Sequence, residues 1–510
     1  MNSATAPHPD SPAAGALPAP TPAPALHRTL DPSDWATHRR LGHRMIDDMV
    51  DFWAGARSRP TWQKPGDDVR ASLRTPLAAG GQSPESVYEE FRRDILPYPT
   101  GNIHPRFWSH VIGTGTAMGA FGDFLAASMN CNVFGGEQVG SLVENQVLGW
   151  LGEMLGFPAT ASGLLLSGGS MANLLGLCVA LRCHAGPALR TEGLCSQPRR
   201  FRFYASTETH NCLDKTAELL GLGRSALRHV AVDQDFRLSL PALEQAIAED
   251  RAAGWVPFCV VGNAITVGTG AIDPLAEIAA VCGREGLWFH VDGAIGALAR
   301  ITPELHPALD AVRLADSVAF DLHKWLHIPY ESGCLMVREG HRHREAFANT
   351  TAYLAALEGG LSSGDRWPNQ LGPELSRGFK ALKVWLSLKE QGRQAFAEAM
   401  SANLAQAAHL VALLGRHADL ELMATAPANI VNFRFHPAAL TAESELEALN
   451  RRILIELHES GHSVPSHNRI HGRFTLRVAI TNHRTRPEDL ESLVEEVRRL
   501  GQRPSAVPIR

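Results

Sequence analysis

The sequence of 510 residues predicts an α/β protein with a largely parallel sheet, followed by a smaller C-terminal α+β unit. Between residues 101 and 385, short apolar runs alternate with helical segments, which is typical of βα units. The runs include GLLLS, RFRFYAS, FCVVGNA, LWFHVDG, SVAFDLH and GCLMVR. After residue 385 come helices and two apolar runs, ANIVNFRF and RFTLRVAI, which indicate antiparallel strands. The length also favours several structural units, because one core rarely serves a chain of this size.

Four parts are expected along the chain. Residues 1–29 are rich in proline and alanine and contain no apolar run, so we expect a disordered tail and no secretory signal. In residues 30–110, the patterns MIDDMVDFW and SVYEEFRRDIL place charged residues around apolar positions, which predicts helices. Residues 111–390 hold the alternating segment, and residues 391–510 form the C-terminal unit.

The composition argues against several classes of function. A formal net charge of −5 without a run of like charges does not favour a nucleic-acid partner. The eight cysteines contain no CxxC pair, which is typical of reduced thiols in a cytoplasmic protein without a zinc site. His467 and His471 in HNRIH have the spacing of one helix face, but no third metal ligand is evident.

One uncharged stretch, residues 154–181, resembles a membrane span in its hydropathy. Glycine and polar residues (SGGSMAN) lie at its centre, and a spanning helix needs about 20 predominantly apolar residues. We therefore expect a buried strand, a tight turn and a helix there, and no membrane partner.

Two charged residues follow predicted core strands. Asp292 ends the run LWFHV, and Lys324 follows the run SVAFDL one strand unit later. Ligands of parallel α/β sheets gather at the carboxyl ends of the strands. A charged lysine at such a place is costly unless something neutralises or uses it. The pair is compatible with a buried salt bridge or with a chemical site.

Small residues follow another predicted strand. The run LLL leads into Ser167, Gly168, Gly169 and Ser170 and then into a helix, so backbone N–H groups can bind an anion. The lysine of a nucleotide-binding P-loop is missing, which favours a monophosphate over a nucleotide. An ordinary strand-to-helix turn is the alternative. His210 begins a helix, where it can cap the helix, lie at the surface or lie flat on an aromatic ring.

Together these residues meet the needs of one cofactor. Pyridoxal phosphate requires an amine for an imine, a carboxylate beside its pyridine nitrogen, a stacking group and a phosphate cup. Lys324, Asp292, His210 and residues 168–170 supply these in turn.

The chain resembles a known family, the group II pyridoxal-phosphate-dependent amino-acid decarboxylases. Within this family it is most similar to the aromatic branch and its bacterial relatives. The resemblance covers about residues 34–500. It rests on HPRFWSHV, VENQVLGWLGEMLGFP, LSGGSMAN, THNCLDKTAELLG, FHVDGAIGA and DLHKWLHIPY. It implies the aspartate-aminotransferase fold (fold type I) with a seven-stranded, mostly parallel sheet. It also implies a homodimer whose N-terminal helices embrace the partner and whose active sites are shared.

The resemblance implies roles for individual residues. Lys324 would form the imine, Asp292 would pair with the pyridine nitrogen, and Ala294 and His210 would lie on the two faces of the ring. Asp273 would support the ring and its neighbours. The expected cofactor contacts are Gly168, Gly169, Ser170, His210, Thr266, Asp292, Ala294, His323 and Lys324, and the expected substrate contacts are Thr114, Trp108 and Phe134.

The substrate class follows partly from an absence. No Lys or Arg occurs between residues 107 and 181, a segment that in the family lines much of the substrate mouth, whereas an acidic substrate would need a buried cation. We expect a carboxy-lyase that converts tryptophan, 5-hydroxytryptophan, tyrosine, dopa or phenylalanine to the amine and CO2. The alternatives are a decarboxylation-dependent aldehyde synthase, a decarboxylase of a non-aromatic amino acid, and a catalytically silent subunit or binding protein.

The sequence departs from the family pattern at three places in or near the expected site. Ile265 stands in NAIT where many relatives have a smaller residue, and Met171 replaces a polar or acidic residue after Ser170. Animal aromatic decarboxylases use a loop tyrosine to return a proton. The matching stretch here, residues 347–372, has one tyrosine, Tyr353, without a secure match. The sequence therefore leaves the proton donor open, and with it the choice between amine and aldehyde.

Overall fold

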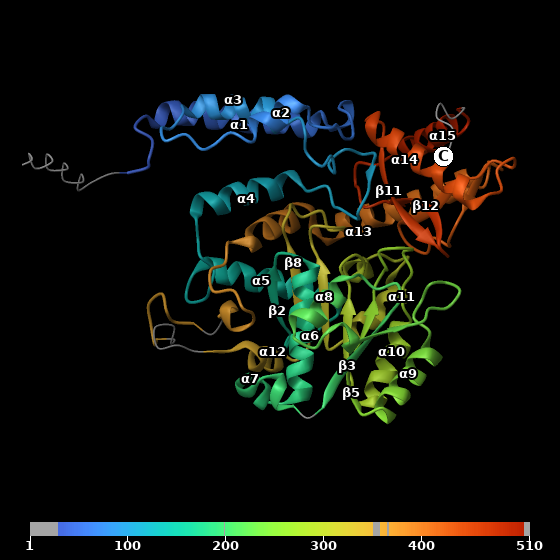
Figure 1. The fold of residues 1–510 in the computed structure, drawn as a ribbon. Helices are drawn as coiled ribbons and strands as arrows, with labels where there is room; N and C mark the ends of the chain where they lie inside the picture. The colour runs from blue at the N-terminus through green and yellow to red at the C-terminus, as the bar shows by residue number, and fades with distance from the viewer. Residues whose placement is uncertain (1–28, 198, 350–356, 365–366, 504–510) are drawn as a thin grey trace, which may run out of the picture.

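The computed structural model describes residues 29–197, 199–349, 357–364 and 367–503. Figure 1 shows N-terminal helices, a central α/β body and a C-terminal unit. Residues 1–28 of the expected N-terminal tail and Tyr353 lie outside the described residues.

The central body contains a seven-stranded sheet in the order β2-β8-β7-β6-β5-β3-β4. Strand β8 runs antiparallel to both of its neighbours, and the other pairs are parallel, so the predicted α/β class with a mostly parallel sheet is confirmed. The strands are β2 (Ser162–Leu166), β3 (Arg200–Ser206), β4 (Leu227–Val230), β5 (Trp255–Asn263), β6 (Trp288–Asp292), β7 (Ser317–Asp321) and β8 (Gly333–Val337).

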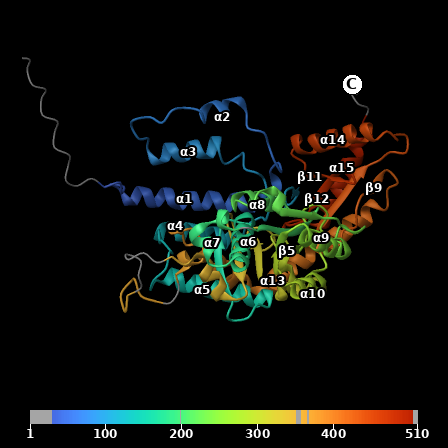
Figure 2. The same cartoon turned by 60° about the horizontal axis from the view of Figure 1, so that its bottom comes forward.

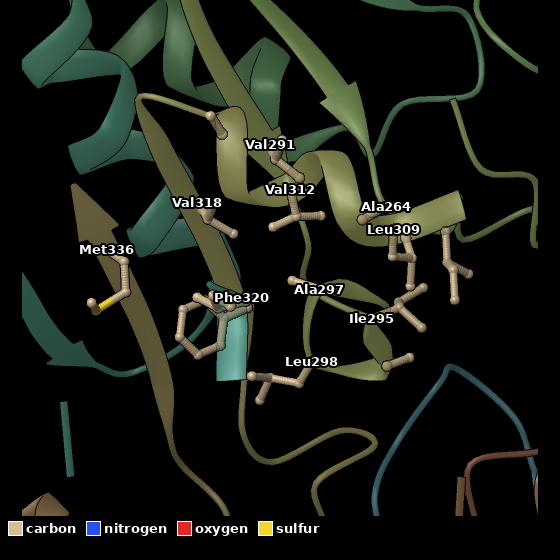
Figure 3. Packing of buried hydrophobic residues seen from close by; sticks show 14 of the residues in the cluster. Ala264, Val291, Ile295, Ala297, Leu298, Leu309, Val312, Val318, Phe320 and Met336 are labelled. Atoms are coloured by element: carbon tan, nitrogen blue, oxygen red, sulfur yellow. The ribbon is translucent and has the colours of Figure 1, made fainter. Parts of the chain in front are cut away.

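Helices cover both faces of this sheet, so the inner strands are buried on both sides. One apolar cluster joins the sheet to helices α5, α9, α10 and α13, and a second joins it to α6, α8 and α12. Figure 3 shows part of the first cluster, where Val318 and Phe320 of β7 lie beside Met336 of β8. The helices of the body are α5 (Val139–Leu155), α6 (Gly169–Ala185), α7 (Ala188–Glu192), α8 (Cys212–Leu219), α9 (Leu240–Ala252), α10 (Leu275–Glu285), α11 (His306–Leu309), α12 (Gly340–Phe347) and α13 (Lys380–Leu414).

The C-terminal unit contains a five-stranded sheet in the order β1-β11-β12-β10-β9. Its strands are β1 (Phe107–Trp108), β9 (Leu420–Leu422), β10 (Ile430–Phe435), β11 (Val464–Ile470) and β12 (Arg473–Ala479), and α14 (Glu443–Glu459) and α15 (Pro487–Gly501) pack on it. Strand β1 thus brings part of residues 30–110 into this unit. Helix α13 crosses residue 390 and is interrupted at Gly392, where φ is 69°. His467 lies on strand β11, so HNRIH does not place its two histidines on one helix face.

The N-terminal helices α1 (Trp35–Ala54), α2 (Asp67–Ser72) and α3 (Pro84–Asp94) lie apart from the central sheet in both views, with α4 (Ala117–Met129) below them in Figure 1 (Figures 1 and 2). Asp34 caps the N-terminus of α1, because its Oδ1 accepts hydrogen bonds from the N–H groups of Ala36 and Thr37. Large apolar side chains of α4 face solvent, since Phe124 is 58% and Met129 is 51% exposed. In the part of the chain that the structure describes, no helix is long and apolar enough to cross a membrane.

Candidate active site

A cavity of about 320 Å³ lies where the carboxyl ends of β6 and β7 meet the N-terminus of α6. Its wall contains Lys324, Asp292, His210 and the segment 167–171. Ala294 and His323 also line it, and Ile265, Val267 and Ile295 supply apolar surface. Because parallel strands end at the same edge of a sheet, residues far apart in the sequence converge here.

Lys324 lies three residues after the last residue of β7. Its Nζ is 3.0 Å from Oδ2 of Asp321, and the Lys324 side chain is 21% exposed. Asp321 is the partner that neutralises the lysine, and the sequence reasoning missed it. The segment DLHK contains the signal, because Asp321 stands three residues before the lysine.

Asp292 is the last residue of β6 and is 6% exposed. Its Oδ1 accepts a hydrogen bond from the Ala294 N–H at 3.1 Å. His210 stands just before α8, and its Nδ1 accepts a hydrogen bond from the Cys212 N–H at 3.2 Å. Desolvation lowers the pKa of His210, against the opposing effect of Asp292, so its ring is neutral at pH 7. A neutral ring is suited to stacking on an aromatic group.

The glycines at the start of α6 form a narrow cradle. A Cβ on Gly169 would lie 2.8 Å from Asp321 Oδ2 and 3.1 Å from the Ala294 Cβ, so a larger residue would have to displace these atoms. The Gly169 N–H donates to Asp321 Oδ1 at 2.6 Å. His323 is fixed from the other side, because its Nδ1 accepts a hydrogen bond from the Ser332 N–H at 3.1 Å.

These residues fit pyridoxal phosphate. The start of a 17-residue helix offers N–H groups to a phosphate, and an amine, a carboxylate and an imidazole line the same cavity. The volume is at the lower end of the range that small-molecule sites occupy.

A buried polar network lies behind the cavity and was not foreseen. Asn173 lines the cavity, and its Oδ1 lies 2.8 Å from His290 Nε2. His290 Nδ1 lies 2.7 Å from Ser317 Oγ, which also accepts the Trp288 indole N–H. Burial lowers the pKa of His290 to about 3, so the ring is neutral.

Asp273 lies behind the same wall, and burial raises its pKa. Its Oδ2 accepts hydrogen bonds from the backbone N–H and the side-chain amide of Asn263, both at 2.8 Å, and Asn263 lines the cavity.

Four expected contacts do not line the cavity in the single chain, namely Thr266, Thr114, Phe134 and Trp108. Thr266 is buried, and its hydroxyl pairs with Thr269 and accepts the Ala271 N–H. Thr114 borders a separate cavity of about 200 Å³. Phe134 packs on Trp367, with 6.0 Å between ring centroids.

The expectation that Trp108 contacts the substrate needs correction. Its side chain is fully buried in the core of the C-terminal unit, and its indole N–H donates to Thr485 Oγ1 at 3.1 Å. Pairing of β1 with β11 places it there, so it is a structural residue rather than a substrate contact.

Arg477 is a cation that the sequence argument missed. It stands on β12, is 6% exposed, and its Nη1 donates to Ser466 Oγ at 2.9 Å. Its Nε and Nη2 have no hydrogen-bond partner within the described ranges, and burial lowers its pKa to about 10. It lies close enough to His110, which lines the cavity, to lower the pKa of that imidazole after the larger effect of desolvation. A cation from outside residues 107–181 therefore lies near one residue of the cavity wall.

Residues 29–197, 199–349, 357–364 and 367–503 contain no group of three or more His, Cys, Asp or Glu side chains that could hold a metal ion.

The fold and these side chains define a fold-type-I pyridoxal-phosphate enzyme. A family model described as the pyridoxal-dependent decarboxylase conserved domain matches residues 67–436, and the chain belongs to this family. The predicted family and cofactor are thereby confirmed, and the protein is a pyridoxal-phosphate-dependent amino-acid decarboxylase.

Individual relatives match over nearly the whole chain. An aromatic-L-amino-acid decarboxylase of Bacillus atrophaeus is 32% identical, over 91% of this chain and 95% of its own length. A phenylacetaldehyde synthase of Petunia hybrida is 27% identical, over 88% of this chain and 91% of its own. The crystal structure of the Oryza sativa TDC with PLP and tryptamine superposes with a TM-score of 0.84 at 26% identity, covering 93% of this chain and 99% of that one.

Proposed function

We propose that this protein decarboxylates an aromatic L-amino acid to the corresponding amine and CO2, and that Lys324 is the lysine that holds the cofactor. The observation that carries the proposal is the convergence of Lys324, Asp292, His210 and the Gly168–Gly169 cradle on one cavity. Each residue type meets one chemical need of pyridoxal phosphate.

The chain's residues have separate tasks in this proposal. Bound pyridoxal phosphate supplies an electron sink for the electron pair that remains at Cα when CO2 leaves. Asp292 would keep the pyridine nitrogen of the bound cofactor protonated, and the neutral ring of His210 would stack on the cofactor. The N–H groups at the start of α6 hold the phosphate. The buried Arg477 is suited to the α-carboxylate of the incoming amino acid, because a carboxylate would satisfy its unpaired N–H groups.

The proposal for Lys324 is tested by Lys324→Ala. We expect the purified variant to lose the visible absorbance that an imine between lysine and cofactor gives, and to release no CO2. Lys389→Ala, a lysine outside the cavity wall, should keep both properties. Undiminished decarboxylation by Lys324→Ala would contradict the assignment.

The aromatic substrate class is supported by the apolar wall of Ile265, Val267 and Ile295 and by the decarboxylases among the relatives. The test is a panel of tryptophan, 5-hydroxytryptophan, tyrosine, dopa, phenylalanine and glutamate, with amine and CO2 measured for each. We expect kcat/KM to be higher for an aromatic acid than for glutamate, and the opposite order would contradict the substrate class.

The second candidate function is a decarboxylation-dependent aldehyde synthase. The Petunia hybrida phenylacetaldehyde synthase among the relatives favours it. The residue that returns the proton decides between the two, and Tyr353 lies outside the described residues. Measuring aldehyde and hydrogen peroxide beside amine distinguishes them, because the decarboxylase yields amine without peroxide.

We also propose a homodimer with shared active sites in the cytoplasm. The exposed apolar side chains of Phe124, Leu125 and Met129 on α4 support an interface there. In such a dimer Thr114 and Phe134 remain candidates for contacts with the partner's substrate. Light scattering should give twice the mass of 55.2 kDa, and Phe124→Glu should shift it toward the monomer. A monomeric, fully active wild-type protein would contradict the proposal.

A further inference from the structure

The carboxylate of Asp321 occupies an unusual position in the phosphate cradle. Its side chain is 4% exposed. Oδ1 accepts the Gly169 N–H at 2.6 Å and lies 3.6 Å from His323 Nε2, while Oδ2 lies 3.0 Å from Lys324 Nζ. A helix N-terminus, an imidazole and an ammonium group thus surround one carboxylate. This is the environment that a phosphate group would find in the same place.

The Asp321 carboxylate and a phosphate group at the start of α6 would compete for the same hydrogen-bond donor. Gly169 is the first residue of α6, so its N–H is one of the helix donors without an internal partner. In this structure that donor is already used by Asp321. The carboxylate also lies within van der Waals distance of the position where a Gly169 side chain would begin. A phosphate that takes the Gly169 N–H must therefore displace a carboxylate oxygen.

We propose that Asp321 is an internal anion that fills the phosphate cradle of the cofactor-free chain and weakens binding of the cofactor's phosphate group. The inference rests on the proposed cofactor site and adds a determinant of cofactor affinity to it.

Two physical effects of the Asp321 carboxylate weaken binding of the phosphate group. The carboxylate competes for the Gly169 N–H, and after displacement it remains beside a second anion in a site with little water, where like charges repel strongly. The neighbouring charges do not remove the repulsion. Lys324 forms an ion pair with Asp321, whereas desolvation lowers the pKa of His323, so this imidazole adds little positive charge at pH 7. Asp292 adds a further carboxyl group to the same cavity.

The direct test compares wild type with Asp321→Asn, which keeps the size and the oxygen acceptor and removes the charge. The probes are 4′-deoxypyridoxine 5′-phosphate and 4′-deoxypyridoxine. Neither has an aldehyde, so neither reacts with Lys324, and they differ only in the phosphate group. Binding to the full-length, cofactor-free protein is measured by titration calorimetry.

We expect Asp321→Asn to bind the phosphorylated probe at least about tenfold more tightly than wild type does. The probe without phosphate should bind both proteins within about twofold. Asp235→Asn, which changes an exposed carboxylate remote from the cavity, should behave as wild type. Asp321→Ser provides a second uncharged variant, and the melting temperature of each variant verifies that it is folded.

Three results would overturn the inference. They are unchanged or weaker binding of the phosphorylated probe to both uncharged variants, an equal gain for both probes, and a gain that Asp235→Asn shares. An equal gain would indicate that release of Lys324, not removal of charge beside the phosphate, is responsible. Failure of the proposed function looks different, because wild type would then bind the probes but release no CO2, or would bind neither probe.

Discussion

Two buried histidines should make the stability of this protein fall in mild acid. His290 is fully buried behind the cavity, with Nδ1 2.7 Å from Ser317 Oγ and Nε2 2.8 Å from Asn173 Oδ1. His343 is also fully buried, between Ser162 Oγ and the Leu371 carbonyl. Burial lowers the pKa of His290 to about 3 and that of His343 to about 4, from an ordinary value of 6.5.

The direction of the change in stability with pH depends on whether the folded or the unfolded chain binds the proton. Below pH 6.5 each histidine is protonated in the unfolded chain but stays neutral in the folded one, so acid favours unfolding. The stability is fully present above pH 6.5 and is lost as the pH falls toward the folded pKa values. Each site contributes about 1.4 kcal/mol per pH unit. At pH 5.5 the two together should have removed about 3 kcal/mol from the free energy of unfolding.

The substitution His290→Gln isolates one of the two sites. Urea unfolding followed by tryptophan fluorescence gives the free energy of unfolding at pH 7.5 and pH 5.5. The contribution of these two sites to the difference should shrink from about 3 to about 1.4 kcal/mol in the variant, whatever the substitution does to stability at pH 7.5. His341→Gln, at an exposed position, should leave the difference as in wild type. An equal pH dependence of His290→Gln and wild type would refute the neutral, buried state of His290.

Two further substitutions test the cradle and the corrected position. Gly169→Ala should weaken cofactor binding about tenfold, because the new Cβ meets Asp321 and Ala294. Gly283→Ala is the control, since a Cβ there has no atom within 4 Å. Equal dissociation constants of the cofactor for Gly169→Ala and wild type would contradict the tight cradle. Trp108→Phe should lower the free energy of unfolding by about 1 kcal/mol through the lost indole hydrogen bond and leave KM unchanged. A changed substrate preference with unchanged stability would instead indicate that Trp108 contacts the substrate.

The central sheet was predictable because its strands are buried on both faces. The runs GLLLS, RFRFYAS, FCVVGNA, LWFHVDG, SVAFDLH and GCLMVR all became strands of one sheet. Strand β4, with the sequence LRHV, was missed because it is a short edge strand whose residues are half polar. Strand β11 was missed for a related reason, since VPSHNRI carries polar residues that no periodic pattern marks as a strand.

The site was predictable where it depends on strand ends. Lys324 and Asp292 follow neighbouring parallel strands, and such strands bring their carboxyl ends together whatever the rest of the fold does. Trp108 and Arg477 depend instead on how the C-terminal sheet docks on the body. A two-residue strand carries Trp108 into that sheet, and an antiparallel strand brings Arg477 toward His110. No local pattern contains that information.

Asp321 explains how a lysine is tolerated at the end of a core strand. Strand β7 ends at Asp321, and the following turn brings the side chain of Lys324 back to the carboxylate three residues earlier. The ion pair offsets part of the desolvation cost of both charges, and the Gly169 N–H stabilises the carboxylate further. The same two interactions are those that a phosphate would replace or weaken. Asp321 therefore has opposite effects in the two states, because it stabilises the cofactor-free chain and opposes the loaded one. Removing its charge should lower the stability of the former while it raises the affinity for the phosphate group.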